Sequence, residues 1–163
     1  ALADGGVTMK QMGVLAAGPL RPEAFKEILR EISRGTAKPW GVNIPLNNPK
    51  AAELLGFLQT PEDRLLLTEL GRQFAAASRK VRKQLFRGQF IQVPIVKRLR
   101  DMLDHSPAHG LARDIILEEL AIQCPQEDPK RLLRILLNWG RFADLWVYQP
   151  ATHTLAPTNG THV

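Results

Sequence analysis

The chain has 163 residues, of which 44% are hydrophobic and 23% charged, which is an ordinary globular composition and enough for one good core or two small domains. It has no apolar run near the roughly 20 residues of a membrane span, and its first residues lack the pattern of a signal peptide. The single cysteine, Cys124, excludes an internal disulfide framework and favours a reducing compartment, so we expect a cytoplasmic protein.

The formal net charge of +6 is unevenly distributed along the chain. Residues 70–100 contain nine basic residues and no acidic residue, a charge of +9, so the rest of the chain sums to −3. A basic block of this kind indicates an anionic partner, which could be nucleic acid, acidic lipid headgroups or the acidic face of a protein.

Residues 1–47 form an atypical N-terminal segment with two short apolar runs, MGVLAAG and PWGVNIPL. Between the runs, residues 22–35 have the marks of a helix: Pro22 suits a first turn, and Gly35 can end the helix. Asn47-Asn48-Pro49 is a turn sequence that should close the second run. We expect either strand, helix and strand or three irregularly joined pieces.

Residues 48–92 predict a partial winged-helix unit and a basic linking helix. A short helix should end at Gly56, and FLQ and RLLL should form a small hairpin around the turn at residues 60–63. Thr68 can cap the next helix, which the basic segment 78–90 is expected to continue. In that segment, the residues expected to face inward are Val81, Leu85 and Phe86, with the arginines and lysines facing outward.

Residues 93–157 predict a second winged-helix unit, followed by a frayed tail at 158–163. Pro94 opens one helix, and residues 111–123 form another with Ile115, Ile116 and Leu120 facing inward. Asp128 can cap a third helix that runs to about Arg141, after which two strands flank a turn at residues 150–152. The predicted fold is therefore mainly α with small β-hairpins (α+β), built from tandem winged-helix units.

The outward basic side chains are the candidate contacts for a partner. On the last helix they recur every three to four residues, so they share one face, and arginine and asparagine can pair with guanine and adenine edges in a major groove. The same face could equally be solvated or contact a protein. The candidates are Arg79, Lys80, Arg82, Lys83, Arg87, Lys97, Arg98, Arg100, Lys130, Arg131, Arg134, Asn138 and Arg141.

Four aromatic residues near the final hairpin allow two interpretations. They could stack on single-stranded bases, or they could pin the hairpin to its helices, as large aromatics do in small cores. These residues are Trp139, Phe142, Trp146 and Tyr148.

The sequence predicts no catalytic site, no metal site and no cofactor. His105 and His109 flank a loop rather than a helix and have no further ligands nearby. No Ser/His/Asp arrangement and no GxxxxGK[ST] phosphate loop is found.

An ordered set of motifs gives a family resemblance over about residues 50–157. The motifs are LLGF at 54–57, LTELGRQF at 67–74, RKQLF at 82–86, VP at 93–94 and WGRFADLWVY at 139–148. Together they resemble the AAA-associated C-terminal accessory domain of nitrate/sulfonate/taurine-type ABC transporter ATPases. The resemblance implies a non-catalytic interaction or regulatory module that docks to a protein, either the transporter ATPase or a second copy as a homodimer. It also implies a place at the inner face of the membrane.

Residues 13–46 resemble a strand–helix–strand stretch of flavin-dependent nitronate monooxygenases and enoyl reductases, although most of a TIM barrel would be missing. Three hypotheses follow: a docking module, a DNA-binding winged-helix protein that uses helices 79–91 and 128–141, and a fragment of a flavin-dependent oxidoreductase.

Overall fold

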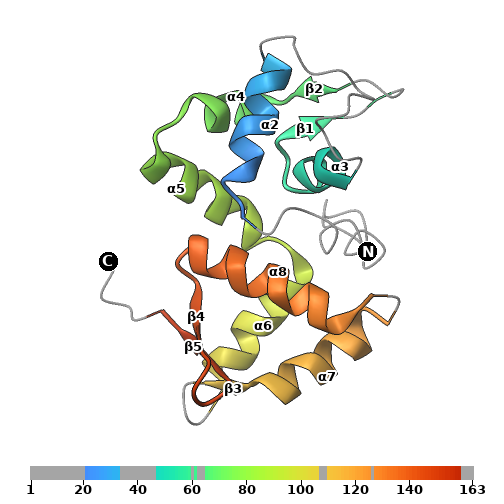
Figure 1. Ribbon diagram of the computed structural model, residues 1–163, viewed down its shortest axis with the longest axis vertical. Coiled ribbons are helices and arrows are strands. Elements are labelled where there is room, and N and C mark those ends of the chain that lie inside the picture. Colours follow the sequence, from blue (N-terminus) through green and yellow to red (C-terminus); the bar gives the residue numbers. More distant parts are fainter. Residues whose placement is uncertain are drawn as a thin grey trace.

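The computed structural model describes residues 21–33, 47–59, 61, 65–106, 110–125 and 127–158. Within these ranges the chain is mainly helical with small antiparallel sheets, which confirms the predicted α+β class (Figure 1). The elements are α2 (Ala24–Ser33), α3 (Asn47–Leu54), β1 (Leu58–Gln59), β2 (Leu66–Leu67), α4 (Glu69–Ala76), α5 (Arg79–Phe90), α6 (Pro94–Asp104), β3 (Leu111–Ala112), α7 (Arg113–Gln123), α8 (Pro129–Phe142), β4 (Trp146–Gln149) and β5 (Thr154–Pro157).

The N-terminal half consists of α2 to α5 and the β1–β2 hairpin. Helix α2 packs against α4 and buries Phe25 and Leu29 completely. The two apolar runs expected on either side of this helix lie outside the described residues. The turn expected at Asn47 is wrong, because Asn47 begins α3.

Two local predictions in this half are confirmed. Gly56 has a φ of +83°, the left-handed conformation that a glycine after a helix adopts at little cost. The Thr68 hydroxyl caps α4 by accepting from the Gly71 amide at 2.9 Å, and it donates to the Gly56 carbonyl at 2.6 Å. The cap and the glycine are thereby tied together, which fixes the hairpin between them.

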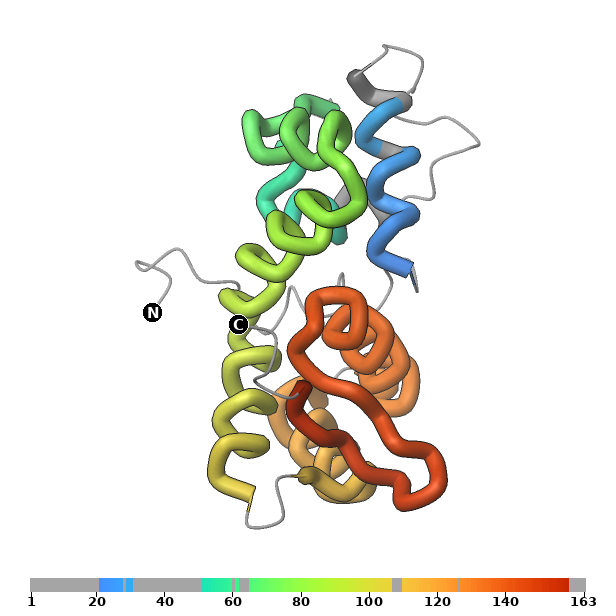
Figure 2. The backbone as a smooth tube through the Cα atoms, turned by 90° about the vertical axis from the view of Figure 1, so that its left-hand side faces the viewer, coloured from blue at the N-terminus to red at the C-terminus, as the bar shows by residue number. Residues whose placement is uncertain are grey.

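The basic segment was expected to continue α4, and this is wrong. It forms a separate helix, α5. Ala77 is extended, and the Ser78 hydroxyl accepts from the Val81 amide to start α5. A serine that caps a new helix competes with the continuation of the old one. After α5, a turn at residues 91–93 leads into Pro94, the first residue of α6. In Figure 2, α5 and α6 run one after the other along one side of the molecule and join its two halves.

The C-terminal half contains α6 to α8 and a three-stranded sheet in the order β3-β5-β4. The predicted strands at the end of the chain are confirmed as β4 and β5, and the predicted Asp128 cap opens α8 at Pro129. Strand β3 was not predicted, because Leu111 and Ala112 continue the helical pattern of α7. They instead pair with Leu155 and Thr154, so pairing with a distant strand overrides the local pattern.

The two halves meet at Trp139 of α8, which is fully buried. Its ring lies edge-on to Phe25 and Phe86, both at 5.5 Å between centroids, and to Phe90 at 5.8 Å. The indole of Trp146, also buried, donates to the Leu136 carbonyl at 3.0 Å. Both tryptophans therefore pin elements together, and neither presents a face on which a base could stack.

Candidate docking surface

The thirteen candidate side chains lie on three helices, α5, α6 and α8, and differ in exposure. Arg79, Lys80, Lys83, Arg87 and Arg82 are on α5; Lys97, Arg98 and Arg100 are on α6; Lys130, Arg131, Arg134, Asn138 and Arg141 are on α8. Nine are exposed, whereas Lys83, Arg100 and Asn138 are half-buried and Arg82 is buried.

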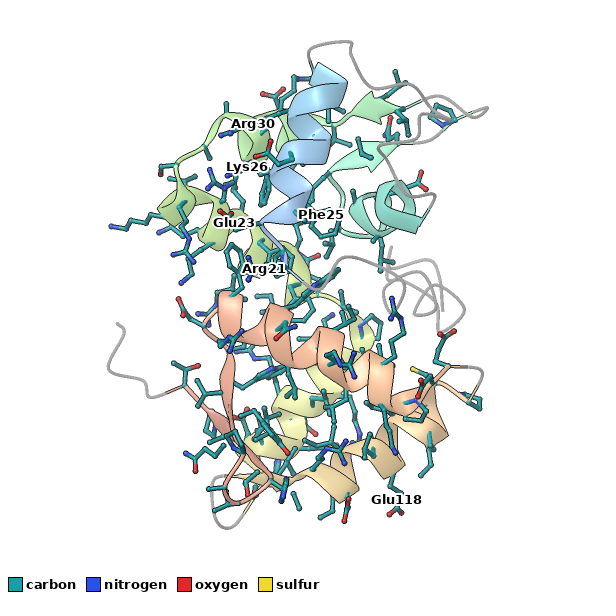
Figure 3. All side chains as sticks on the ribbon, in the orientation of Figure 1. Arg21, Glu23, Phe25, Lys26, Arg30 and Glu118 are labelled. Carbon is teal, nitrogen blue, oxygen red and sulfur yellow. The ribbon has the colours of Figure 1, made fainter. Side chains whose placement is uncertain are left out.

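Arg82 was expected to face outward, and this is wrong: only 6% of the residue is exposed. Its guanidinium donates to both carboxylate oxygens of Glu23, each at 2.8 Å, and to the Ala77 carbonyl at 2.6 Å. The hydrogen bonds between the two side chains, opposed by burial, hold the pKa of Glu23 below its usual value and raise that of Arg82. Figure 3 shows Glu23 at the start of α2, beside α5. Arg82 therefore joins α2 to α5, and its guanidinium is used inside the fold.

Val81 takes the opposite position and is exposed, although it was expected inside. The buried side of α5 carries Arg82, Phe86 and Phe90, which recur every four residues. The choice between Val81 and Arg82 depended on hydrophobicity alone. The sequence could not show that Glu23, which is 59 positions away, would neutralise a buried arginine.

Two other basic residues of α5 gather around Phe142 at the end of α8. Arg79 and Lys83 lie over the Phe142 ring at 5.9 and 5.8 Å from its centroid. Lys83 also pairs with Asp144 at 3.5 Å. Of these two, Arg79 is the exposed one, and it extends the basic surface of α8 across to α5.

The basic residues of α6 are partly neutralised by their neighbours. Arg98 donates to Glu119 of α7 at 3.0 Å, and this hydrogen bond lowers the pKa of Glu119. Asp101 lies one turn further along α6, 4.0 Å from Arg98. Lys97 remains exposed, but the surroundings of α6 are mixed in charge.

The outer face of α8 carries more exposed basic side chains than α5 or α6 does. Lys130, Arg134 and Arg141 are exposed along it, and Asn138 lies between them, 3.5 Å from the Arg141 guanidinium. The helix contains four basic residues and no acidic one, while its opposite face is buried from Leu132 to Gly140. We call the set Lys130, Arg134, Asn138 and Arg141 the α8 basic face.

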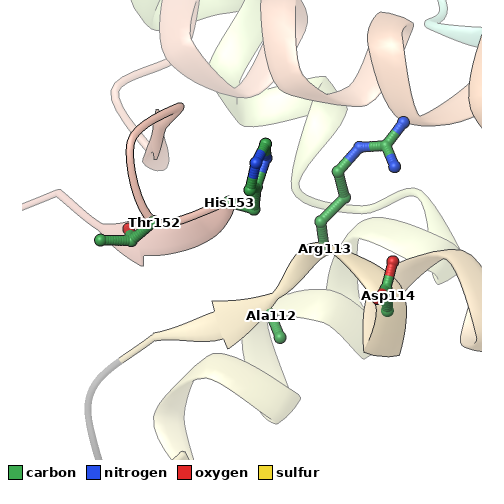
Figure 4. A pocket seen from close by; sticks show the side chains of 5 residues that line it. All are labelled: Ala112, Arg113, Asp114, Thr152 and His153. Atoms are coloured by element: carbon green, nitrogen blue, oxygen red, sulfur yellow. The ribbon is translucent and has the colours of Figure 1, made fainter.

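A cavity of about 350 Å³ lies beside the start of α7, lined by Ala112, Arg113, Asp114, Thr152 and His153. In Figure 4 the Arg113 and His153 side chains rise on the same side, whereas Thr152 points away from His153. The cavity mixes cationic and anionic groups, and the Nδ1 atom of His153 lies 3.3 Å from the Tyr148 hydroxyl.

Cys124 and His105 are further candidates that the structure describes. Cys124 is buried, and burial raises the pKa of its thiol, which disfavours the reactive thiolate. Contacts with the carbonyl and carboxylate of Asp101 raise the pKa of His105, and His109 lies outside the described residues. Within the described ranges, no group of three or more His, Cys, Asp or Glu side chains could hold a metal ion, and no helix could span a membrane.

The exposed apolar face of α7 was not predicted from the sequence. Ile115 was expected inside, but it is 51% exposed on α7, and Ile122 is 64% exposed. Successive helix residues point about 100° apart, so Ile115 lies outside the row that Ile116 and Leu120 form at a spacing of four residues. That spacing was the signal available in the sequence, and Ile116 and Leu120 are the residues that α7 buries.

Residues 43–149 match the family described as C-terminal AAA-associated domain. Comparison with curated proteins gives no match, and comparison with solved structures gives none either. The likeness of residues 13–46 to nitronate monooxygenases is thus not supported, and α2 packs into the same core as the matched region. Since the match covers more than half of the chain and includes α3 to β4, the protein belongs to the family of C-terminal AAA-associated domains.

Proposed function

We propose that this chain is a non-catalytic docking module of an ABC transporter ATPase, and that the α8 basic face binds an acidic surface of that ATPase. The observation that carries the proposal is the composition of α8, with exposed basic side chains on one face and no acidic residue in the helix. Arg79, close to Phe142, extends the same surface. Such a module would act in the cytoplasm, at the inner face of the membrane.

We further propose that residues 93–157 form a winged-helix unit. The order of elements supports this: helix α6, strand β3, helices α7 and α8, then β4 and β5, with β5 central in the sheet. In this arrangement α8 is the third helix, directly before the hairpin, and it holds its basic face away from the core.

The test is isothermal titration of the chain with a purified nitrate/sulfonate/taurine-type ATPase subunit from the same cell. Binding should weaken by at least about tenfold in the double variant Arg134→Glu/Arg141→Glu, because two attractive contacts become repulsive. The matched control is Arg87→Glu/Lys97→Glu, which changes the net charge equally on α5 and α6 and should bind nearly as well as the wild type. Equal weakening in both variants would show that overall charge, not the α8 basic face, drives binding.

DNA binding is the second candidate, favoured by the arginines and Asn138 on a helix that precedes a hairpin. A labelled duplex titrated at about 50 and 200 mM salt should then lose orders of magnitude in affinity across that range if several phosphates are contacted. No binding at the lower salt would reject this candidate and leave the protein-docking proposal untouched.

A further inference from the structure

The outer face of α7 combines exposed apolar and acidic side chains in two adjacent rows. Ile115 and Ile122, the most exposed large hydrophobic residues of the described chain, lie two turns apart in one row. Asp114 and Glu118, both exposed, form the row beside them. Figure 3 shows Glu118 pointing away from the molecule at the end where α7 lies. Exposed isoleucines grouped on one face indicate a contact surface.

The outer face of α5 has the same layout with the opposite charge. Val81 is 41% exposed, and a side chain added at Gly88 would meet nothing within 4 Å, so this row is apolar and open. Lys80 and Gln84 lie in the adjacent row, and Arg87 lies at the outer edge of that row. All three side chains are exposed. The buried residues of α5, including the Arg82 pair with Glu23, are on the far side of the helix.

The two helices correspond position by position. Counted from the first residue of each helix, Lys80 matches Asp114, Val81 matches Ile115, Gln84 matches Glu118, and Gly88 matches Ile122. If the two outer faces pack antiparallel, each row meets its counterpart. Arg87 then lies between Asp114 and Glu118, Lys80 lies on the other side of Glu118, and the apolar rows lie against each other. In this antiparallel order Val81 lies against Ile122, and Gly88 provides space for the Ile115 side chain, as a small residue does where helices approach closely.

We propose that α7 of one copy of this chain packs antiparallel on α5 of a second copy. The distribution of charge along the chain supports a second copy as the partner of these two faces. Residues 70–100, which include α5, carry +9, whereas residues 101–128, which include α7, hold seven acidic residues and one arginine, a charge of −6. In Figure 1, α5 lies in the upper half and α7 at the lower end, so one molecule cannot bring its own two faces together. The contact joins two different surfaces, and repeating it gives either a closed ring or an open chain.

The experiment is sedimentation velocity of the whole chain over about 10 to 500 µM at low salt, a range suited to a weak contact. The wild type should sediment faster as its concentration rises, and raising the salt should weaken the association. The acidic-row variant Asp114→Lys/Glu118→Lys and the basic-row variant Lys80→Glu/Arg87→Glu should each weaken self-association by about tenfold or more. Both variants change exposed residues, and far-ultraviolet circular dichroism will show whether they keep the fold.

Mixing the two variants gives the decisive result. Alone, each variant presents like charges on both faces, but in the mixture every α5 finds an α7 of opposite charge, so association should return. A monomeric wild type at all concentrations would overturn the proposal, and so would association that neither variant weakens or a mixture that stays monomeric. The α8 basic face takes no part in this contact. The Arg134→Glu/Arg141→Glu variant should therefore self-associate normally, and this inference and the proposed function can fail separately.

Discussion

The two sides of α8 have different surroundings, although they belong to one helix of fourteen residues. The inner side carries Trp139 and Gly140, which fit between α2, α5 and β4 with almost no free space. The outer side carries the α8 basic face, whose arginine and lysine side chains extend into solvent. The inner side is fixed by packing, and the role that we propose for the outer side is to bind a partner.

Helix α5 also has a buried and an exposed side, but residues of the same type occur on both. Arg82 and Arg87 are both arginines, yet the first is buried in a bidentate ion pair and the second is exposed. The role of a basic residue in this protein is therefore set by what lies opposite it. Substitutions on the buried side should change the free energy of unfolding more than substitutions on the exposed side. We take them from the largest expected effect to the smallest.

Replacing Gly140 by valine should have the largest effect on stability. A Cβ atom at this position would come within 2.0 Å of the Trp146 ring nitrogen, a ring held on both sides by the core. Overpacking of this kind should lower the free energy of unfolding by about 3 kcal/mol or more. Urea denaturation measures the change in the free energy of unfolding, with Gly88→Ala as the control. Gly88 is helical and open, so alanine there should stabilise by about 0.5–1 kcal/mol.

Arg82→Met should come next, because it leaves the Glu23 carboxylate without its partner. Only 27% of the Glu23 side chain is exposed, so we expect a loss of about 2–3 kcal/mol, less than for a fully buried pair. The matched variant Arg87→Met, on the outer side of α5, should stay within about 0.5 kcal/mol of the wild type. If the two variants melt alike, the ion pair does not hold α2 to α5.

A smaller effect should follow from pH. The pKa of Glu23 is lowered in the folded chain by Arg82, so the ion pair stabilises the fold above the unfolded pKa of about 4.3. This stability is lost as the pH falls through the folded pKa of Glu23. Glu119, whose pKa Arg98 lowers, acts in the same direction. In urea titrations from pH 7 down to about pH 3, Glu23→Gln should be less sensitive to acid than the wild type. An unchanged acid sensitivity would mean that Glu23 does not contribute.

Local chemistry accounts for the features that the sequence predicted well. Thr68, Gly56 and Asp128 act within one turn of their own position, so their effects on the chain could be inferred without knowledge of the fold. The spacing of the basic residues of α8 likewise identified its exposed side. The ordered motifs from residue 54 to residue 148 identified the family, since they span most of the matched region.

Features that depend on distant partners could not be predicted. Strand β3 exists because Leu111 pairs with Leu155, and Arg82 is buried because Glu23 reaches it from α2. In both cases the local pattern favours another structure, and a contact more than forty positions away decides the outcome. Ile115 of α7 was wrongly predicted to face inward because hydrophobicity was taken to mean burial.

The central claim is that the outer side of α8 serves recognition and not folding, and one double variant tests it most directly. For Arg134→Glu/Arg141→Glu, we predict a free energy of unfolding within about 0.5 kcal/mol of the wild type, because exposed substitutions rarely cost more. We predict that the same preparation has lost at least about tenfold in affinity for the ATPase subunit. A folded variant that binds as tightly as the wild type would contradict the account.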